Sequence, residues 1–185
     1  MAPAGSDREP VAVSIAALAD RIGRPAFTAV CVDLLAGAPR ERYVAELRGL
    51  TGRTWEPGDA VLDRSRWKDY WVRTWGARGL LHVWDEAATP AVVRGLADGH
   101  YRPAEMCLKV AARYDVAGTG DGAAALADHA LPRVRAQAVR CLAVTGDTEH
   151  VAVVTAHLAD EHPDVRRQAA RALETLRRRL DLDDT

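Results

Sequence analysis

Apolar and small residues recur along this chain with a period of 31 residues. The matching stretches begin at Val72, Pro103, Val134 and Val165. In each stretch the apolar or small positions fall at offsets 0, +4, +7 and +8, which form one stripe of a helix. A fixed period of this length is typical of stacked supersecondary units. The pattern therefore predicts a repeat protein in which each stretch is one helix of a repeating unit.

A shorter apolar segment precedes the repeated helix, and the two together predict an antiparallel pair. Three of these shorter segments end in the triplet Leu-Ala-Asp, at residues 96–98, 126–128 and 158–160. Pro163 suits the first turn of the helix that follows, where its missing N–H costs nothing. A small residue always occupies offset +4 and lets a neighbouring helix approach closely; these residues are Gly76, Cys107, Ala138 and Ala169.

The last two units carry the pattern most clearly. Residues 160–173 read Asp-Glu-His-Pro-Asp-Val-Arg-Arg-Gln-Ala-Ala-Arg-Ala-Leu, which resembles the HEAT-repeat family and in particular its lyase-type HEAT-like repeats. The resemblance covers roughly residues 66–181. It implies an all-α fold, a short right-handed α-solenoid of stacked antiparallel helix pairs. It also implies a structural ladder between neighbouring turns, built from Arg73, Arg135 and Arg166 with Asp98, Asp128 and Asp160.

The N-terminal third departs from the regular pattern, although helical spacing continues through much of it. Terminal repeats are atypical because one of their faces meets water. We therefore expect three regions. Residues 1–10 are expected to be disordered, residues 11–65 to form a helical cap with a degenerate repeat, and residues 66–185 to form the regular repeats.

Composition excludes several classes of protein. The formal net charge is −1, so bulk charge does not point to nucleic acid. The three cysteines lack Cys-x-x-Cys spacing, which favours reduced thiols in a cytoplasmic protein. The chain has no apolar run long enough to cross a bilayer and no secretory apolar segment, so we expect no membrane partner.

The histidines and glycines do not predict a metal, cofactor or catalytic site. His100, His129 and His162 each fall at the turn inside a unit, and stacking spaces them by a whole repeat. That spacing is too long for one metal centre, whose ligands lie about 2 Å from the ion. The Gly-rich run at residues 118–122 lacks the Gly-Lys-Ser/Thr of a phosphate-binding loop, so we interpret it as a turn.

All five tryptophans lie between residues 55 and 84. Trp67, Trp71 and Trp75 are four residues apart and therefore share one helix face. These rings either fill the seam between the N-terminal helices and the regular repeats, or they wall a groove for a side chain, a base or a small apolar ligand. Both interpretations stay open for the aromatic cluster, which we define as Trp67, Tyr70, Trp71 and Trp84.

A basic column is the strongest functional lead. Offset +6 holds a base in every unit and points away from the apolar stripe. In HEAT-type solenoids the second helices line the concave face, so the resemblance implies a basic groove there. The alternative is a solvated face that repeat duplication has copied. The groove residues, at offsets +3 and +6, are Trp75, Arg78, Met106, Lys109, Gln137, Arg140, Gln168 and Arg171.

These features favour a non-enzymatic protein-interaction scaffold that binds an acidic partner or peptide in the basic groove. The alternative is a DNA glycosylase with HEAT-like repeats, a resemblance of architecture. Those enzymes use an aspartate among aromatic residues, and only Asp69 and Asp85 are candidates here. Nucleic acid is therefore a possible but not a favoured partner. A lyase or chaperone for a chromophore is a third hypothesis.

Overall fold

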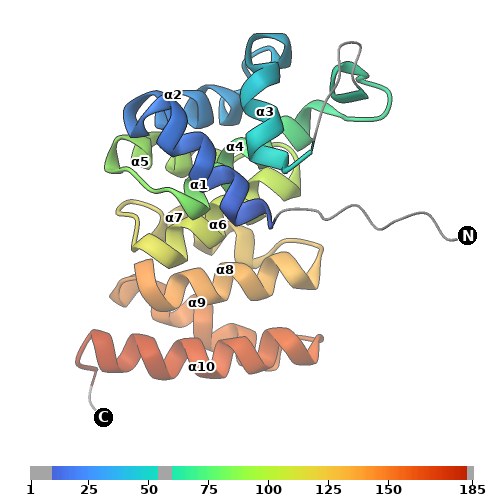
Figure 1. Cartoon of the computed structure of the whole chain (residues 1–185). Helices are drawn as coiled ribbons and strands as arrows, with labels where there is room; N and C mark the ends of the chain where they lie inside the picture. Colours follow the sequence, from blue (N-terminus) through green and yellow to red (C-terminus); the bar gives the residue numbers. More distant parts are fainter. Residues whose placement is uncertain (1–9, 54–59, 183–185) are drawn as a thin grey trace, which may run out of the picture. The chain divides into compact units, whose positions relative to one another are not determined.

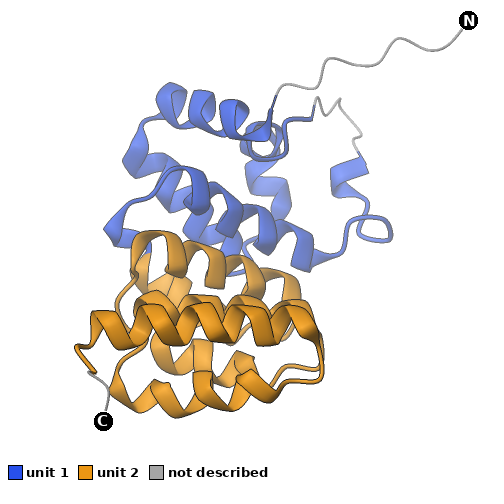
Figure 2. Ribbon diagram, turned by 90° about the horizontal axis from the view of Figure 1, so that it is seen from below, with its two compact units in different colours: residues 1–88 blue, residues 89–185 orange. Residues whose placement is uncertain are grey.

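The computed structural model describes residues 10–53 and 60–182, and the regular elements in these ranges are all helices (Figure 1). The predicted all-α fold is confirmed. Trp55 and nearly all of the segment expected to be disordered lie outside the described residues. The chain divides into two compact units, Met1–Ala88 and Thr89–Thr185 (Figure 2).

Unit 1 consists of four α-helices and three short 3-10 helices among its described residues. In this unit α1 packs on α3, and α2 packs on α4. The helix that opens the 31-residue pattern, α4, thus belongs with the N-terminal helices. The elements are α1 (Val11–Ile22), α2 (Arg24–Leu35), η1 (Arg40–Tyr43), α3 (Val44–Thr51), η2 (Ala60–Leu62), α4 (Asp69–His82) and η3 (Glu86–Ala88).

Two glycines allow α2 and α4 to touch. A Cβ atom on Gly76 would lie 2.6 Å from the carbonyl oxygen of Cys31, and one on Gly79 would lie 2.4 Å from the Cys31 Sγ atom. Both distances are too short for any side chain, so the helices come close only because these positions are glycine. The small residue predicted at offset +4 therefore has its expected role at Gly76.

Unit 2 holds the regular helix pairs. The first helices α5, α7 and α9 pack against the second helices α6, α8 and α10, and the second helices stack in the order α6, α8, α10 (Figure 1). This is the predicted short solenoid. Its elements are α5 (Thr89–Gly95), α6 (Tyr101–Tyr114), α7 (Gly120–Ala127), α8 (Pro132–Thr145), η4 (Thr148–His150), α9 (Val151–Ala156), η5 (His157–Ala159) and α10 (Pro163–Arg179).

The apolar stripe read from the sequence forms the core of unit 2. Its first and small positions are completely buried in both of the last two units, at Val134 and Ala138 and again at Val165 and Ala169. Leu142 and Leu173 at offset +8 are also buried. Burial of this stripe is the main favourable contribution to the fold of the unit.

A buried ion pair ties the last two repeats together. Arg135 donates from Nε to Oδ2 of Asp160 at 2.7 Å and from Nη2 to Oδ1 at 2.9 Å, and the two side chains are 10% and 7% exposed. Its other nitrogen, Nη1, donates to the carbonyl oxygens of His129 and Ala130. Arg166 donates to the carbonyl oxygens of Asp160 and Glu161. The expected ladder is therefore present at this junction.

The ladder does not include Asp128, whose side chain is exposed and bonds to no other described residue. The unit before Asp128 carries Ala104 at the position that Arg135 occupies in the next unit. No guanidinium is there to reach the carboxylate. The expectation that Asp128 belongs to the ladder is therefore wrong.

Candidate functional site

The exposed side of α8 and α10 presents two arginines without a counter-ion. The guanidinium groups of Arg140 and Arg171 are exposed, and neither forms an ion pair or a hydrogen bond with a described residue. They occupy equivalent positions, offset +6, on neighbouring helices. Their charge is therefore available to a ligand or a partner protein.

Lys109, the member of the basic column on α6, is partly neutralised. Its Nζ lies 3.0 Å from Oε1 of Glu105, one turn earlier on the same helix. Glu105 also accepts from Nε of Arg133 at 3.0 Å, which joins α6 to α8. The Glu105 carboxylate is almost buried. Lys109 and Arg133 compensate its negative charge, whose burial without a partner would cost free energy. Met106 beside them is half-buried.

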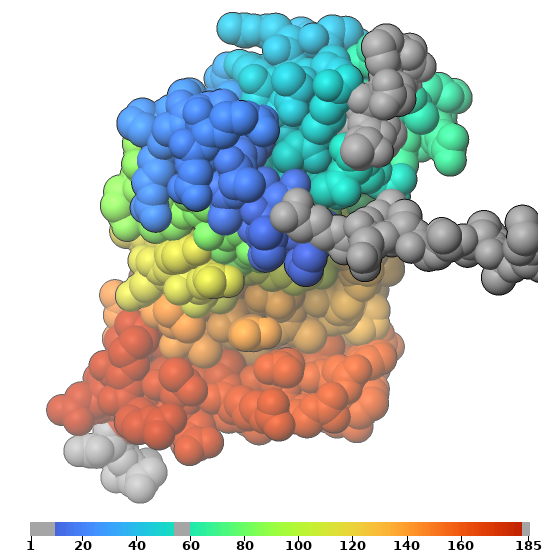
Figure 3. Space-filling view, in the orientation of Figure 1, coloured from blue at the N-terminus to red at the C-terminus, as the bar shows by residue number. Residues whose placement is uncertain are grey.

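A cavity of about 580 Å³ lies between the N-terminal halves of α8 and α10, the two layers that adjoin in the space-filling view (Figure 3). Three of the predicted groove residues line it: Gln137, Arg140 and Gln168. The structure adds seven residues that the repeat pattern did not select. They are Leu131, Pro132, Arg133, Ala136, His162, Asp164 and Arg167.

The electrostatics of the cavity favour an anion. Arg133, Arg140 and Arg167 line it against a single carboxylate, that of Asp164. Arg167 pairs with Asp164 and Arg133 with Glu105, which leaves Arg140 uncompensated. Helices α8 and α10 both begin at this cavity, and helix N-termini carry partial positive charge. The site therefore offers hydrogen-bond donors and positive charge beside a small apolar wall.

The prediction that Trp75 lines the groove is corrected by its burial. Trp75 is only 4% exposed, because α4 turns this face toward Trp67 and Trp71. The ring centroids of Trp67 and Trp71 lie 5.3 and 6.4 Å from that of Trp75. Trp75 is thus a core residue and offers no contact surface.

Arg78 also differs from the exposed bases of unit 2. Its Nη2 donates to the carbonyl oxygen of Leu50 at 2.6 Å, near the end of α3. Burial lowers the pKa of Arg78, and the charge of Arg53 lowers it further. The guanidinium holds α3 and α4 together and is only half-exposed. The basic residue at offset +6 therefore bonds to a neighbouring helix in unit 1, whereas Arg140 and Arg171 of unit 2 are exposed.

The aromatic cluster lies in unit 1, where the rings of Trp67, Tyr70 and Trp71 are in contact. Trp71 meets Trp67 edge to face at a centroid distance of 6.1 Å and Tyr70 at 5.5 Å. The guanidinium of Arg53 lies 5.1 Å from the centroid of a Trp67 ring. Trp67, Tyr70 and Trp71 are half-buried. Trp84 follows α4, and its indole N–H donates to Glu86.

The turn histidines bond to the backbone where the second helices begin: His100 and His162 are the N-cap residues of α6 and α10, and His129 precedes Leu131, the N-cap residue of α8. Nδ1 of His100, His129 and His162 accepts a hydrogen bond from a backbone N–H two residues further on, at 3.2, 3.0 and 3.2 Å. The rings of His100 and His162 thereby satisfy an N–H group that the start of a helix leaves without an intrahelical partner. Among the residues that the structure describes, no group of histidine, cysteine, aspartate and glutamate could hold a metal ion.

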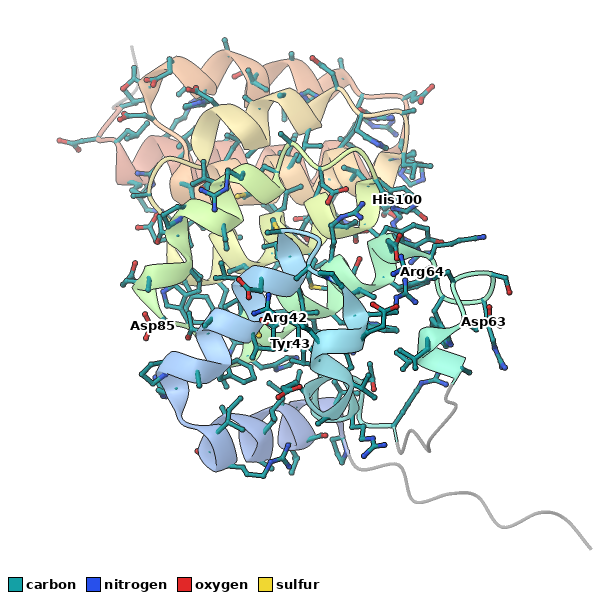
Figure 4. All side chains as sticks on the ribbon, turned by 90° about the horizontal axis from the view of Figure 1, so that it is seen from above. Arg42, Tyr43, Asp63, Arg64, Asp85 and His100 are labelled. Carbon is teal, nitrogen blue, oxygen red and sulfur yellow. The ribbon has the colours of Figure 1, made fainter. Side chains whose placement is uncertain are left out.

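The two aspartates considered for base excision both hold local structure. Asp69 accepts from Nη2 of Arg40 at 2.5 Å, and the Arg40 side chain is 1% exposed, so Asp69 is the counter-ion of a buried charge. The hydrogen bond from Arg40 lowers the pKa of Asp69. Asp85 accepts from the N–H of Ala87 at 2.9 Å. Asp85 also lies across unit 1 from Arg64, which bonds to Asp69 (Figure 4).

The cysteines offer no nucleophile for attaching a chromophore. Cys31, Cys107 and Cys141 are buried as free thiols. Burial raises the pKa of each thiol, that of Cys141 to about 11. Each thiol therefore stays protonated at neutral pH, whereas the thiolate is the reactive form.

Comparison with known families identifies the repeats. A family model for HEAT repeats matches residues 122–184. Residues 122–184 therefore carry HEAT repeats. The match begins within α7, continues through α10 and therefore includes the cavity between α8 and α10. HEAT repeats generally mediate protein–protein interaction. Neither a curated protein nor a solved structure matches the chain significantly.

No helix in the described part of the chain is long and apolar enough to cross a bilayer.

Proposed function

We propose that this HEAT-repeat chain is a non-enzymatic interaction scaffold that binds an acidic segment of a protein partner. The contact would be made on the exposed side of α8 and α10. The observation that carries the proposal is the cavity between these helices, with the uncompensated Arg140 in its wall and Arg171 at the equivalent position of the next helix. Opposite charge on a partner would steer its approach and set its register.

The groove of the proposal is smaller than the one predicted from the periodicity. It comprises Gln137, Arg140, Gln168 and Arg171, with Met106 and Lys109 as an extension along α6. Lys109 contributes less because Glu105 already neutralises part of its charge. The interaction is expected to depend mainly on the two uncompensated arginines.

A fluorescently labelled oligoglutamate peptide tests this function by anisotropy, with an oligolysine of equal length as the control for charge. We expect the oligoglutamate to bind and the oligolysine not to bind. The double variant Arg140→Gln with Arg171→Gln should weaken oligoglutamate binding by about tenfold or more, because charge-assisted contacts are the stronger ones. Its unfolding free energy should change by only about 0.5 kcal/mol, since both side chains are exposed.

Arg94→Gln is the matched control. Arg94 is also exposed and belongs to unit 2, but it lies on the first helix α5. This variant should bind oligoglutamate as the wild type does. If the control and the double variant lose equal affinity for oligoglutamate, the binding depends on net charge alone. That outcome would contradict the proposed site.

A further inference from the structure

The repeat geometry of α8 and α10 sets the spacing of the binding groups. The two helices pack directly on each other, with completely buried alanines at Ala138 and Ala169. Packed helices lie about 8–10 Å apart. Equivalent side chains on the two helices, Arg140 with Arg171 and Gln137 with Gln168, therefore recur at about that interval.

Peptide conformations differ in the distance along the chain between side chains that point in the same direction. A polyproline II segment has three residues per turn and rises about 3.1 Å per residue, so it repeats every 9.3 Å or so. A β-strand repeats every two residues, which is about 6.7 Å. An α-helix places neighbouring side chains of one face about 5–6 Å apart, three or four residues along. Polyproline II matches the step between α8 and α10.

Two glutamine amides distinguish an extended segment from a helical one. Gln137 and Gln168 are half-buried in the wall of the cavity, and neither amide bonds to another described residue. A glutamine amide both donates and accepts hydrogen bonds. A helix has already satisfied its own backbone groups, whereas polyproline II leaves every backbone group unbonded. The amides therefore suit the backbone of an extended chain.

From these observations we propose that the partner segment is an extended, polyproline II-like peptide with acidic side chains three residues apart. One carboxylate would meet Arg140 and the next would meet Arg171, with the Gln137 and Gln168 amides bonded to the backbone between them. The residues between the acids would lie against the apolar wall formed by Leu131, Pro132 and Ala136. This inference rests on the proposed function and adds the conformation and the spacing of the ligand.

Three probes of equal charge test the spacing by anisotropy on the full chain. The first is a peptide in which Glu-Pro-Pro is repeated four times. The second is a permutation of the same residues with no two glutamates three positions apart, and proline keeps both peptides extended. The third is an alanine-rich helical peptide with four glutamates spaced seven residues apart. We expect the first to bind about tenfold more tightly than either of the others.

The variants separate the two kinds of contact. In Arg140→Gln with Arg171→Gln, the preference for the three-residue spacing should vanish. In Gln137→Leu with Gln168→Leu, affinity for both proline-rich peptides should fall by roughly threefold to tenfold while the spacing preference remains, because only backbone hydrogen bonds are lost. Arg94→Gln should change neither quantity.

Several outcomes would contradict the inference, and only some of them would also contradict the proposed function. If the first two peptides bind equally and the arginine variant still weakens their binding, the proposed three-residue spacing is wrong. The acid-binding function then stands. Tighter binding of the helical peptide has the same meaning. Failure of every acidic peptide to bind above an oligolysine control removes the proposed function as well.

Discussion

At the scale of single residues, a charged side chain is paired or exposed according to the residue that the stacking of repeats places next to it. Asp160 and Asp128 end the same Leu-Ala-Asp triplet in successive units. Asp160 receives two hydrogen bonds from Arg135, whereas Asp128 is exposed, because Ala104 replaces the arginine. The two aspartates are equivalent in sequence but therefore contribute differently to the stability of the fold.

The Arg135–Asp160 pair predicts a specific dependence of stability on pH. The hydrogen bonds from Arg135 lower the pKa of Asp160 from 3.8 to about 2, which corresponds to about 2 kcal/mol at neutral pH. A lowered pKa means that this stabilisation is complete above pH 4 or so and is lost as the pH falls through 2. Asp160→Asn should therefore destabilise the protein by about 2 kcal/mol at pH 7.

Urea unfolding of the wild type and of Asp160→Asn at pH 7 and at lower pH measures this effect. The gap between the two should close as the pH approaches 2. Asp128→Asn is the matched control and should cost about 0.5 kcal/mol or less at each pH. A gap that stays constant with pH would mean that the charge of Asp160 does not contribute.

At the scale of helices, contact depends on small residues at one offset. A side chain at Gly76 would collide with α2 in unit 1, and Ala138 and Ala169 are completely buried in unit 2. Tight packing of this kind makes inserted methylene groups costly. It also holds α8 and α10 at the spacing on which the proposed peptide site depends.

Ala169→Leu is expected to destabilise the protein by roughly 1–3 kcal/mol, because overpacking forces helices apart or side chains out of their rotamers. Ala138→Leu should behave in the same way. The control is Ala170→Leu, one residue along α10 and exposed, which should leave the free energy of unfolding nearly unchanged. Chemical denaturation provides the measurement, and wild-type stability in the two buried variants would show that this column does not carry the packing.

At the scale of the whole molecule, a net charge of −1 coexists with local positive charge on α8 and α10. Such a chain can select an acidic segment without attracting every polyanion. We expect only weak binding to duplex DNA at physiological salt. The logarithm of the affinity should vary little with the logarithm of the salt concentration, because few counter-ions are released.

Anisotropy with a labelled duplex between 50 and 200 mM salt, roughly the range over which DNA binders lose most affinity, tests this expectation. Steep salt dependence, or release of an alkylated base from the duplex, would favour the glycosylase alternative. Asp69→Asn should then abolish base release. If Asp69 is only the counter-ion of Arg40, the same change should lower stability and affect no reaction.

The sequence by itself determined the helical repeats, the buried stripe of each second helix and the turn positions of the histidines. These features follow from local periodicity, because the spacing of apolar residues decides which side of a helix is buried. Only the tertiary structure decided that Trp75 is core, that Arg78 bonds to α3, and that Arg133 and Arg167 line the cavity. Arg167 corresponds to Ala136 in the preceding unit. Arg133 corresponds to Arg102 in the preceding unit but to Asp164 in the next. Neither offset carries a base in every unit, so periodicity did not select them. Whether a polar side chain is paired, buried or available depends on residues that are distant in sequence, and only the packing of the helices brings those residues together.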